Sequence, residues 1–107
     1  MKTFVKFCGL RQPEEVGEVP AGGAAGFVVG VPASPRNVEL ERAARLIERL
    51  PSEAEAWAVV VEPTVEMIRQ LFDDVGVDRI QVYGAVPEGL EYLERHHLVP
   101  SVPVAPA

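Results

Sequence analysis

The sequence lacks the features that accompany disulfides, nucleic-acid binding and membrane insertion. A single cysteine among 107 residues rules out an internal disulfide and fits a reducing compartment. Ten lysines and arginines stand against 16 aspartates and glutamates, without a basic cluster, so nucleic acid is not an expected partner. No apolar run approaches the ~18 residues of a membrane span, and the N-terminal residues lack the apolar core of a secretory signal. We therefore expect a cytoplasmic protein that binds neither nucleic acid nor a membrane.

Metal ligands are equally sparse. The two histidines, His96 and His97, are adjacent, and both are distant in sequence from Cys8. This spacing does not match the ligand sets of structural or catalytic metals, so we predict neither a metal site nor a bound cofactor. The histidines instead suit the last turn of a helix, where the helix dipole favours positive charge.

What the sequence does contain is a recurring unit: a short β-branched run, a turn, and an amphipathic helical stretch. The pattern predicts strands at residues 3–7, 25–29, 56–61, 79–82 and 98–99, and helices at 13–19, 38–50, 65–75 and 87–95. This order indicates an α/β fold of about four and a half parallel β/α units with right-handed crossovers. We expect one domain over residues 1–107 with a proline-rich tail from about residue 99. Periodicity leaves open whether the sheet closes into a barrel, which needs ~200 residues or more.

Some details of these elements follow from single residues. Asn37 is the expected N-cap of the second helix, and Thr64 that of the third. The apolar stripe of the second helix is predicted to contain Leu40, Ala43, Ala44, Ile47 and Leu50. The nearly continuous apolar run at 56–61 is typical of a parallel strand that is buried on both faces.

Residues that follow the strands are the candidates for chemistry, because functional groups of parallel β/α folds gather at the strands' carboxyl ends. Cys8 ends the first strand, and Lys6, two residues earlier, points to the same side. Positive charge from Lys6 or Arg36 can hold a thiolate reactive at this position. The alternative is that Cys8 is a small, buried, apolar residue.

The same loops carry motifs of a known family. Residues 6–10 (Lys-Phe-Cys-Gly-Leu) resemble the K-I/F-C-G-I/L segment that opens phosphoribosylanthranilate isomerases of tryptophan biosynthesis. Residues 26–28 (Gly-Phe-Val) are similar to the second strand of that family, and residues 32–36 (Pro-Ala-Ser-Pro-Arg) to its P-x-S-x-R loop. Residues 80–84 (Ile-Gln-Val-Tyr-Gly) stand where the family has V/L-Q-L-H-G. The resemblance covers residues 2–98 and implies the N-terminal half of a (β/α)8 TIM barrel.

The resemblance implies an Amadori rearrangement, the aldose-to-ketose isomerisation of N-(5′-phosphoribosyl)anthranilate. It implies that Cys8 is the general base and that Arg36 holds the anthranilate group. Gln81 and Lys6 are the further candidate substrate-binding residues. Arg36 equally fits a solvated loop arginine, and Gln81 a strand residue whose amide is satisfied locally. Lys6 needs a partner inside a barrel, and the sequence does not identify one.

Two parts of the family's active site have no counterpart here. The family's general acid is an aspartate on the sixth strand, and its phosphate site comes from the seventh and eighth loops. Asp73, Asp74 and Asp78 do not fit the acid's place, because they belong to the connection that precedes a strand. Tyr83 replaces the family's histidine, which removes a group that titrates near neutral pH.

Three hypotheses follow. The first is an isomerase-like protein whose catalytic base is Cys8 and which completes its site by self-association or with a C-terminal half-barrel chain; a monomer with an open, flavodoxin-like sheet is the remaining possibility for its assembly. The second is a non-catalytic α/β binding or assembly module derived from the same family. The third is an unrelated small α/β domain with a redox-sensing cysteine.

Overall fold

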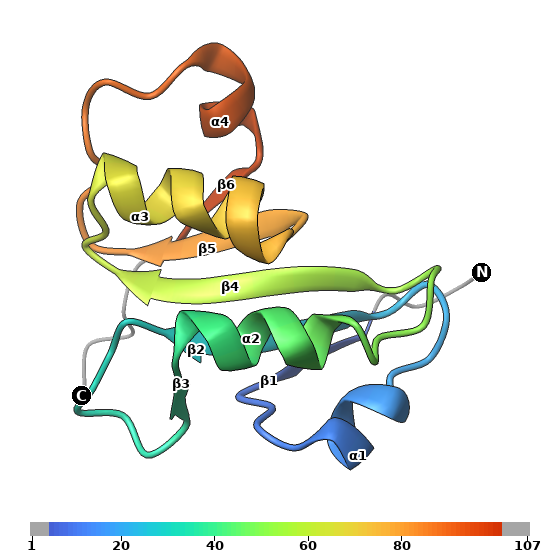
Figure 1. Ribbon diagram of the computed structural model, residues 1–107. Helices are drawn as coiled ribbons and strands as arrows, with labels where there is room; N and C mark the ends of the chain where they lie inside the picture. The colour runs from blue at the N-terminus through green and yellow to red at the C-terminus, as the bar shows by residue number, and fades with distance from the viewer. Residues whose placement is uncertain (1–4, 102–107) are drawn as a thin grey trace, which may run out of the picture.

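Residues 5–101 are described by the computed structural model, and they form one parallel sheet with helices packed against it (Figure 1). The strands are β1 (Lys6–Cys8), β2 (Ala24–Val29), β3 (Asn37–Val38), β4 (Glu55–Val61), β5 (Arg79–Tyr83) and β6 (Leu98–Ser101). The helices are α1 (Pro13–Gly17), α2 (Leu40–Ile47), α3 (Val65–Gln70), its π-helical continuation η1 (Leu71–Val75), and α4 (Tyr92–His96). The predicted strand residues Thr3 and Phe4 and the tail after Ser101 lie outside the described residues.

The predicted parallel α/β topology is confirmed. The sheet order is β1-β2-β4-β5-β6, every pair is parallel, and the two-residue strand β3 pairs with the end of β2. Consecutive main strands are therefore neighbours, joined by crossovers that place α2 and α3 side by side on one face (Figure 1). All the main strands end at the same edge of the sheet, which fixes where functional loops gather.

The helices cover one face of the sheet. Along β4, Ala56, Ala58 and Val60 are buried, whereas Trp57 and Val59 on the opposite face are only partly buried. The prediction that this strand is buried on both faces is therefore wrong for the described chain. On the second face the Lys6 ammonium lies over the Trp57 ring, and exposure is highest at the strand end, where Val61 is 49% exposed.

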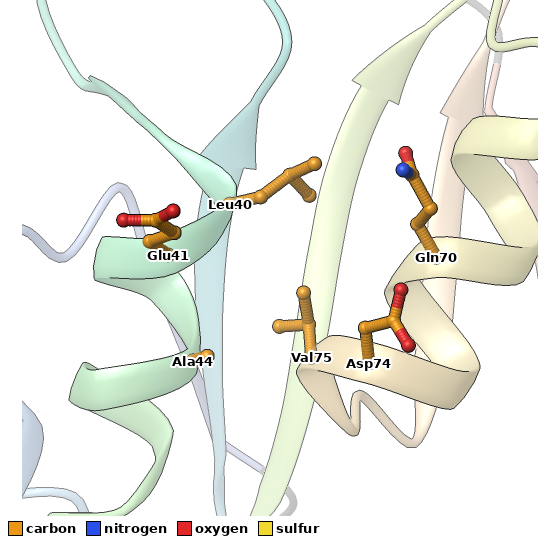
Figure 2. A pocket seen from close by; sticks show the side chains of 6 residues that line it. All are labelled: Leu40, Glu41, Ala44, Gln70, Asp74 and Val75. Carbon is orange, nitrogen blue, oxygen red and sulfur yellow. The ribbon is translucent and has the colours of Figure 1, made fainter.

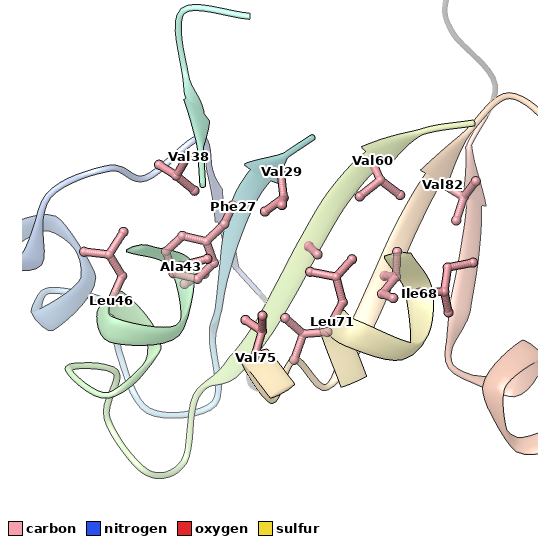
Figure 3. Packing of buried hydrophobic residues seen from close by; sticks show 14 of the residues in the cluster. Phe27, Val29, Val38, Ala43, Leu46, Val60, Ile68, Leu71, Val75 and Val82 are labelled. Carbon is pink, nitrogen blue, oxygen red and sulfur yellow. The ribbon is translucent and has the colours of Figure 1, made fainter. Parts of the chain in front are cut away.

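The hydrophobic core lies between the sheet and helices α2, α3 and η1 (Figure 3). The largest fully buried side chain of this core is Phe27 of β2. The α3–η1 helix contributes Ile68 and Leu71 to the same core. In α2, Ala43 and Leu46 are buried, one turn apart. The predicted stripe contained Ala43 but missed Leu46. Its other members are partly buried and pack against the core: Leu40, Ala44, Ile47 and Leu50.

Two predicted helix starts are corrected. Asn37 is not an N-cap: it lies in β3, and its side-chain Oδ1 accepts a hydrogen bond of 2.8 Å from the Val31 N–H. The Asn37 amide thus stabilises the preceding loop, and the helix begins after Glu39. The fourth helix begins after Glu91 rather than at Pro87, because Gly89, with φ of 94°, interrupts a helical path.

The predicted cap at Thr64 is confirmed, since its Oγ1 accepts a 3.1 Å hydrogen bond from the Met67 N–H. We expect Thr64→Ala to lower the free energy of unfolding by about 1 kcal/mol, because one N–H of the first turn of α3 loses its acceptor. Thr64→Ser keeps the hydroxyl and should stay close to wild type. Urea denaturation measures both; an alanine variant as stable as the serine variant would contradict the assignment.

Candidate active site at the carboxyl ends of the strands

Cys8 is the last residue of β1 and its side chain is exposed. The alternative that it is a small buried apolar residue is therefore wrong. Lys6 precedes it on the same, uncovered face of the sheet, while Phe7 between them faces the helix-covered side. The thiol is thus open to a ligand at the strand end, as the loop position predicts.

Gly26 makes the room that these two side chains occupy. It lies beside Cys8 in the β1–β2 register. A methyl group at residue 26 would come within 3.3 Å of the Cys8 Cα, the Cys8 Sγ and the Lys6 Cε. The sequence identified Gly26 as part of a strand motif, but its role in clearing this face depends on strand register and was missed.

Arg36 reaches the end of β1 from a distant loop. Its Nη1 donates a 3.3 Å hydrogen bond to the Gly9 carbonyl, next to Cys8, and its backbone N–H donates to the Ser34 Oγ at 3.2 Å. Gly9 has a φ of 75°, and a Cβ there would lie 2.5 Å from the Arg36 Cδ. The structure therefore places the Arg36 guanidinium against Gly9, the residue that follows Cys8.

Polar contacts fix the loop after β1. The Glu15 carboxylate accepts hydrogen bonds from the Arg11 and Gln12 N–H groups, at 3.1 and 3.0 Å. These two backbone donors, more than the nearby arginines, lower the pKa of Glu15 below its ordinary value. The Arg11 Nη1 donates to the Pro35 carbonyl at 2.8 Å, so the loops that carry Cys8 and Arg36 are joined to each other.

Lys6 and Gln81 form a second cluster on the same face. The Lys6 Nζ donates to the Gln81 Oε1 and lies 4.5 Å from the centroid of the Trp57 ring. The Gln81 Nε2 in turn donates to the Tyr83 Oη at 3.2 Å. The partner that the sequence could not assign to Lys6 is thus an amide on β5 together with an aromatic ring on β4.

The contact between Lys6 and Gln81 shows that the sheet is curved. Their strands, β1 and β5, are separated by β2 and β4. Three strand spacings amount to about 14 Å along the sheet, which the two side chains bridge because the uncovered face is concave. The Lys6–Gln81 pair, Trp57 and Cys8 therefore lie on the inner side of an arc.

A hollow of about 320 Å³ lies elsewhere, between α2 and the α3–η1 helix (Figure 2). Leu40, Ala44 and Val75 form its apolar lining, and Asp74 stands at its edge. It contains none of the candidate site residues. Asp78 is also remote from the loops, because its Oδ2 accepts from the Ala56 N–H near the start of β4. The prediction that these aspartates do not stand at the strands' carboxyl ends is confirmed.

Other classes of site have no counterpart in the described residues. Within residues 5–101, no three histidine, cysteine, aspartate or glutamate side chains are grouped so that they could hold a metal ion. Over the same range, no helix is long and apolar enough to cross a membrane.

Known proteins match the chain over about half of their length. A scan against protein-family profiles finds no match. The N-(5′-phosphoribosyl)anthranilate isomerase of Chelativorans sp. strain BNC1 is 34% identical over 103 residues, covering 94% of this chain and 47% of that protein. The crystal structure of phosphoribosyl anthranilate isomerase from Thermotoga maritima matches with a TM-score of 0.71 and 26% identity, over 92% of this chain and 50% of that one. A phosphoribosyl anthranilate isomerase in complex with reduced 1-(o-carboxyphenylamino)-1-deoxyribulose 5-phosphate has the same TM-score, 0.71, and identity, 26%, over 92% of this chain and 53% of its own.

We expect Gly26→Ala to lower the free energy of unfolding by about 1–3 kcal/mol, because the new methyl group forces Lys6 and the Cys8 main chain apart. Gly17→Ala is the matched control: a Cβ there meets nothing within 4 Å, so the change should stabilise slightly. Chemical denaturation measures both variants. Equal stability of Gly26→Ala and wild type would contradict this expectation, because it would show that the inner face accommodates a methyl group at residue 26.

The lowered pKa of Glu15 predicts a dependence of stability on pH. Its ionised form is favoured by the folded state, so its contribution is complete above the ordinary pKa of 4.5 and is lost as pH falls through the folded-state value. The free energy of unfolding should therefore fall less between about pH 5 and pH 3 in Glu15→Gln than in wild type. The control is Glu14→Gln, which removes the same charge at the neighbouring residue. Parallel curves for wild type and Glu15→Gln would refute the expectation.

Proposed function

The chain belongs to the phosphoribosylanthranilate isomerase family, and we propose that it supplies the base-carrying half of an enzyme that isomerises N-(5′-phosphoribosyl)anthranilate. The observation that carries this proposal is the exposed Cys8 thiol at the end of β1 with the Arg36 guanidinium bonded to the adjacent residue. The chain spans about half the length of the relatives it matches, so the activity is assigned to a completed site.

Cys8 is proposed as the general base. The ring-opened substrate is an imine protonated on nitrogen, and its C2′ carries the proton to be removed. As the Sγ takes that proton, the C2′–H electron pair forms the C1′=C2′ double bond, and the C1′=N π pair moves onto the nitrogen, which is left as a neutral amine. The resulting enol becomes the ketone when its hydroxyl proton is lost and a proton is added at C1′. An exposed thiol at a strand end is accessible to this carbon, and a thiolate needs no further cofactor for the step.

Arg36 is proposed to bind the carboxylate of the anthranilate ring. Its bond to the Gly9 carbonyl uses one N–H of a group that has five, so the guanidinium keeps donors for a bidentate contact. A solved relative binds a molecule with a carboxyphenylamino group and a 5-phosphate. For this chain we propose a small phosphorylated substrate of the same kind.

Lys6 and Gln81 are proposed to form the floor of the substrate site. The Lys6 ammonium lies on the same face as the thiol and attracts an anionic substrate. Gln81 holds that ammonium with its carbonyl oxygen and contacts Tyr83 with its amide nitrogen. Both residues would then bind substrate through the charge and the hydrogen bonds of this pair.

The general acid and the phosphate site are proposed to come from a second half. By family resemblance the acid stands on the sixth main strand, whereas the described chain reaches the fifth, β6. The candidates for the partner are a second copy of the chain or a C-terminal half-barrel chain. We propose the cytoplasm as the compartment, because a single exposed thiol stays reduced there.

A non-catalytic assembly module is the second candidate. Tyr83, which replaces the family's histidine, hydrogen-bonds to Gln81. This bond gives the inner-face cluster a structural role without chemistry. In that case Cys8 and Arg36 would contact no substrate.

One assay separates the catalytic candidate from the assembly module. The chain is mixed with the part of the Chelativorans isomerase that it does not match, and the turnover of phosphoribosylanthranilate by the mixture is measured. We expect Cys8→Ser to lower kcat by about 10²- to 10⁴-fold, because the general base is lost. Arg36→Gln should mainly raise KM, since it removes a ground-state contact with the carboxylate. Circular dichroism controls for folding. An assembled complex without turnover, or one whose turnover survives Cys8→Ser, would refute the catalytic role.

A further inference from the structure

Cys8 and Tyr83 lie at the same level of the inner face, the concave side of the sheet that the helices do not cover. The Lys6–Gln81 hydrogen bond joins β1 to β5 across this face. Side chains two residues apart on a strand point to the same side. The next inward side chain toward the carboxyl ends is therefore Cys8 on β1 and Tyr83 on β5. The thiol and the phenol thus stand on opposite sides of the inner face.

The backbone fixes the position of Tyr83. It is paired with Val61 of β4 on one side and with Ser101 of β6 on the other. Its carbonyl also accepts a 2.8 Å hydrogen bond from the Glu62 N–H, just beyond the end of β4. Because a strand paired on both sides holds its side chains more precisely than a loop does, the phenol is presented to the inner face in a defined place.

The direction of the Tyr83 hydroxyl follows from the charge of Lys6. An ammonium group has only donors, so the Gln81 amide turns its oxygen toward Lys6 and its nitrogen toward Tyr83. The amide nitrogen also has only donors, so the Tyr83 Oη accepts, at 3.2 Å. The hydroxyl hydrogen then points away from the amide and is directed toward another acceptor. Because the ammonium polarises the amide and the amide polarises the hydroxyl, this hydrogen is a strengthened donor.

Resting on the proposed function, we propose that Tyr83 is a further substrate-binding residue, whose hydroxyl donates a hydrogen bond to the oxygen on C2′ of the sugar. Cys8 is the proposed base for the hydrogen on the same carbon. The hydrogen and the oxygen on C2′ point in different directions, so a thiol and a donor on opposite sides of the inner face each meet one of them. The contact turns the C2′–H bond toward the Sγ, which is the alignment that proton transfer needs.

The same hydrogen bond is kept in the product. When the enol becomes the ketone, the oxygen on C2′ changes from a hydroxyl to a carbonyl, and both groups accept a hydrogen bond. Tyr83 gives up no proton in this role. It positions C2′ and selects sugars that carry an oxygen there, because a sugar without that oxygen leaves the polarised hydroxyl without an acceptor.

Two ligands test the contact on the 107-residue chain. The first is reduced 1-(o-carboxyphenylamino)-1-deoxyribulose 5-phosphate, the molecule in complex with a solved relative, in which reduction leaves a hydroxyl on C2′. The second is the same compound without that hydroxyl. An NMR titration that follows the indole signal of Trp57, which lies against the Lys6 ammonium, measures even weak binding. We expect wild type to bind the first ligand about three- to tenfold more tightly, as one hydrogen bond contributes.

Three variants locate the donor. Tyr83→Phe should remove this preference, because it deletes the hydroxyl and keeps the ring. Gln81→Glu should remove it with the tyrosine intact, since a carboxylate has no N–H and the hydroxyl turns its hydrogen toward residue 81. Tyr92→Phe, at the exposed tyrosine of α4, is the matched control and should keep the preference.

A Tyr83 that only supports the inner face gives a different result, because its loss weakens both ligands equally. That result, an unchanged preference in Tyr83→Phe, or no saturable shift of wild type with the first ligand would overturn the proposal. The proposed function fails separately. A chain that prefers the hydroxyl-bearing ligand but gives no turnover that depends on Cys8 refutes the base and leaves the Tyr83 contact in place.

Discussion

The hydrogen bond from Lys6 to Gln81 across the inner face is the contact on which the arrangement of the site depends. It joins the first strand to the fourth main strand across the concave face of the sheet. It forms because Gly26 carries no side chain, so the lysine stem passes over β2 to reach Trp57 and the amide. The curvature then brings the end of β1, with Cys8, to the inside of the arc.

The two faces of the sheet serve different purposes. The helix-covered face is a packed hydrophobic core around Phe27, and its burial stabilises the described strands and helices. The inner face combines a lysine, a glutamine and a tryptophan with exposed valines. A polar layer of this kind restricts which side chains can face it, so it favours one partner over others.

The sequence predicts the elements of this fold well and their contacts less well. Strands were identifiable from β-branched runs, and the Thr64 cap from its position before an apolar stripe. The N-cap prediction for Asn37 was wrong because the asparagine amide stabilises turns as well as helix starts, and here it bonds within the loop. The Lys6–Gln81 bond was not predictable, since alternation along a strand gives the face of each side chain but not the curvature that brings distant strands together. Motif resemblance brought Cys8 and Arg36 into one hypothesis, but that the Arg36 side chain bonds to Gly9, next to Cys8, was visible only in the fold of residues 30–37.

Under the proposed function, the open arc bears on the reactivity of Cys8. Cys8 is exposed, so water hydrates any thiolate that forms there. A wall closed over this face would exclude that water and strengthen the interaction of Cys8 and Arg36 with the proposed anionic, ring-opened substrate. The proposed acid would then stand opposite the proposed base, at a distance that the rest of the wall determines. In that arrangement the proposed base and carboxylate-binding group lie at the ends of the strands described here, and their reactivity depends on the strands that close the wall.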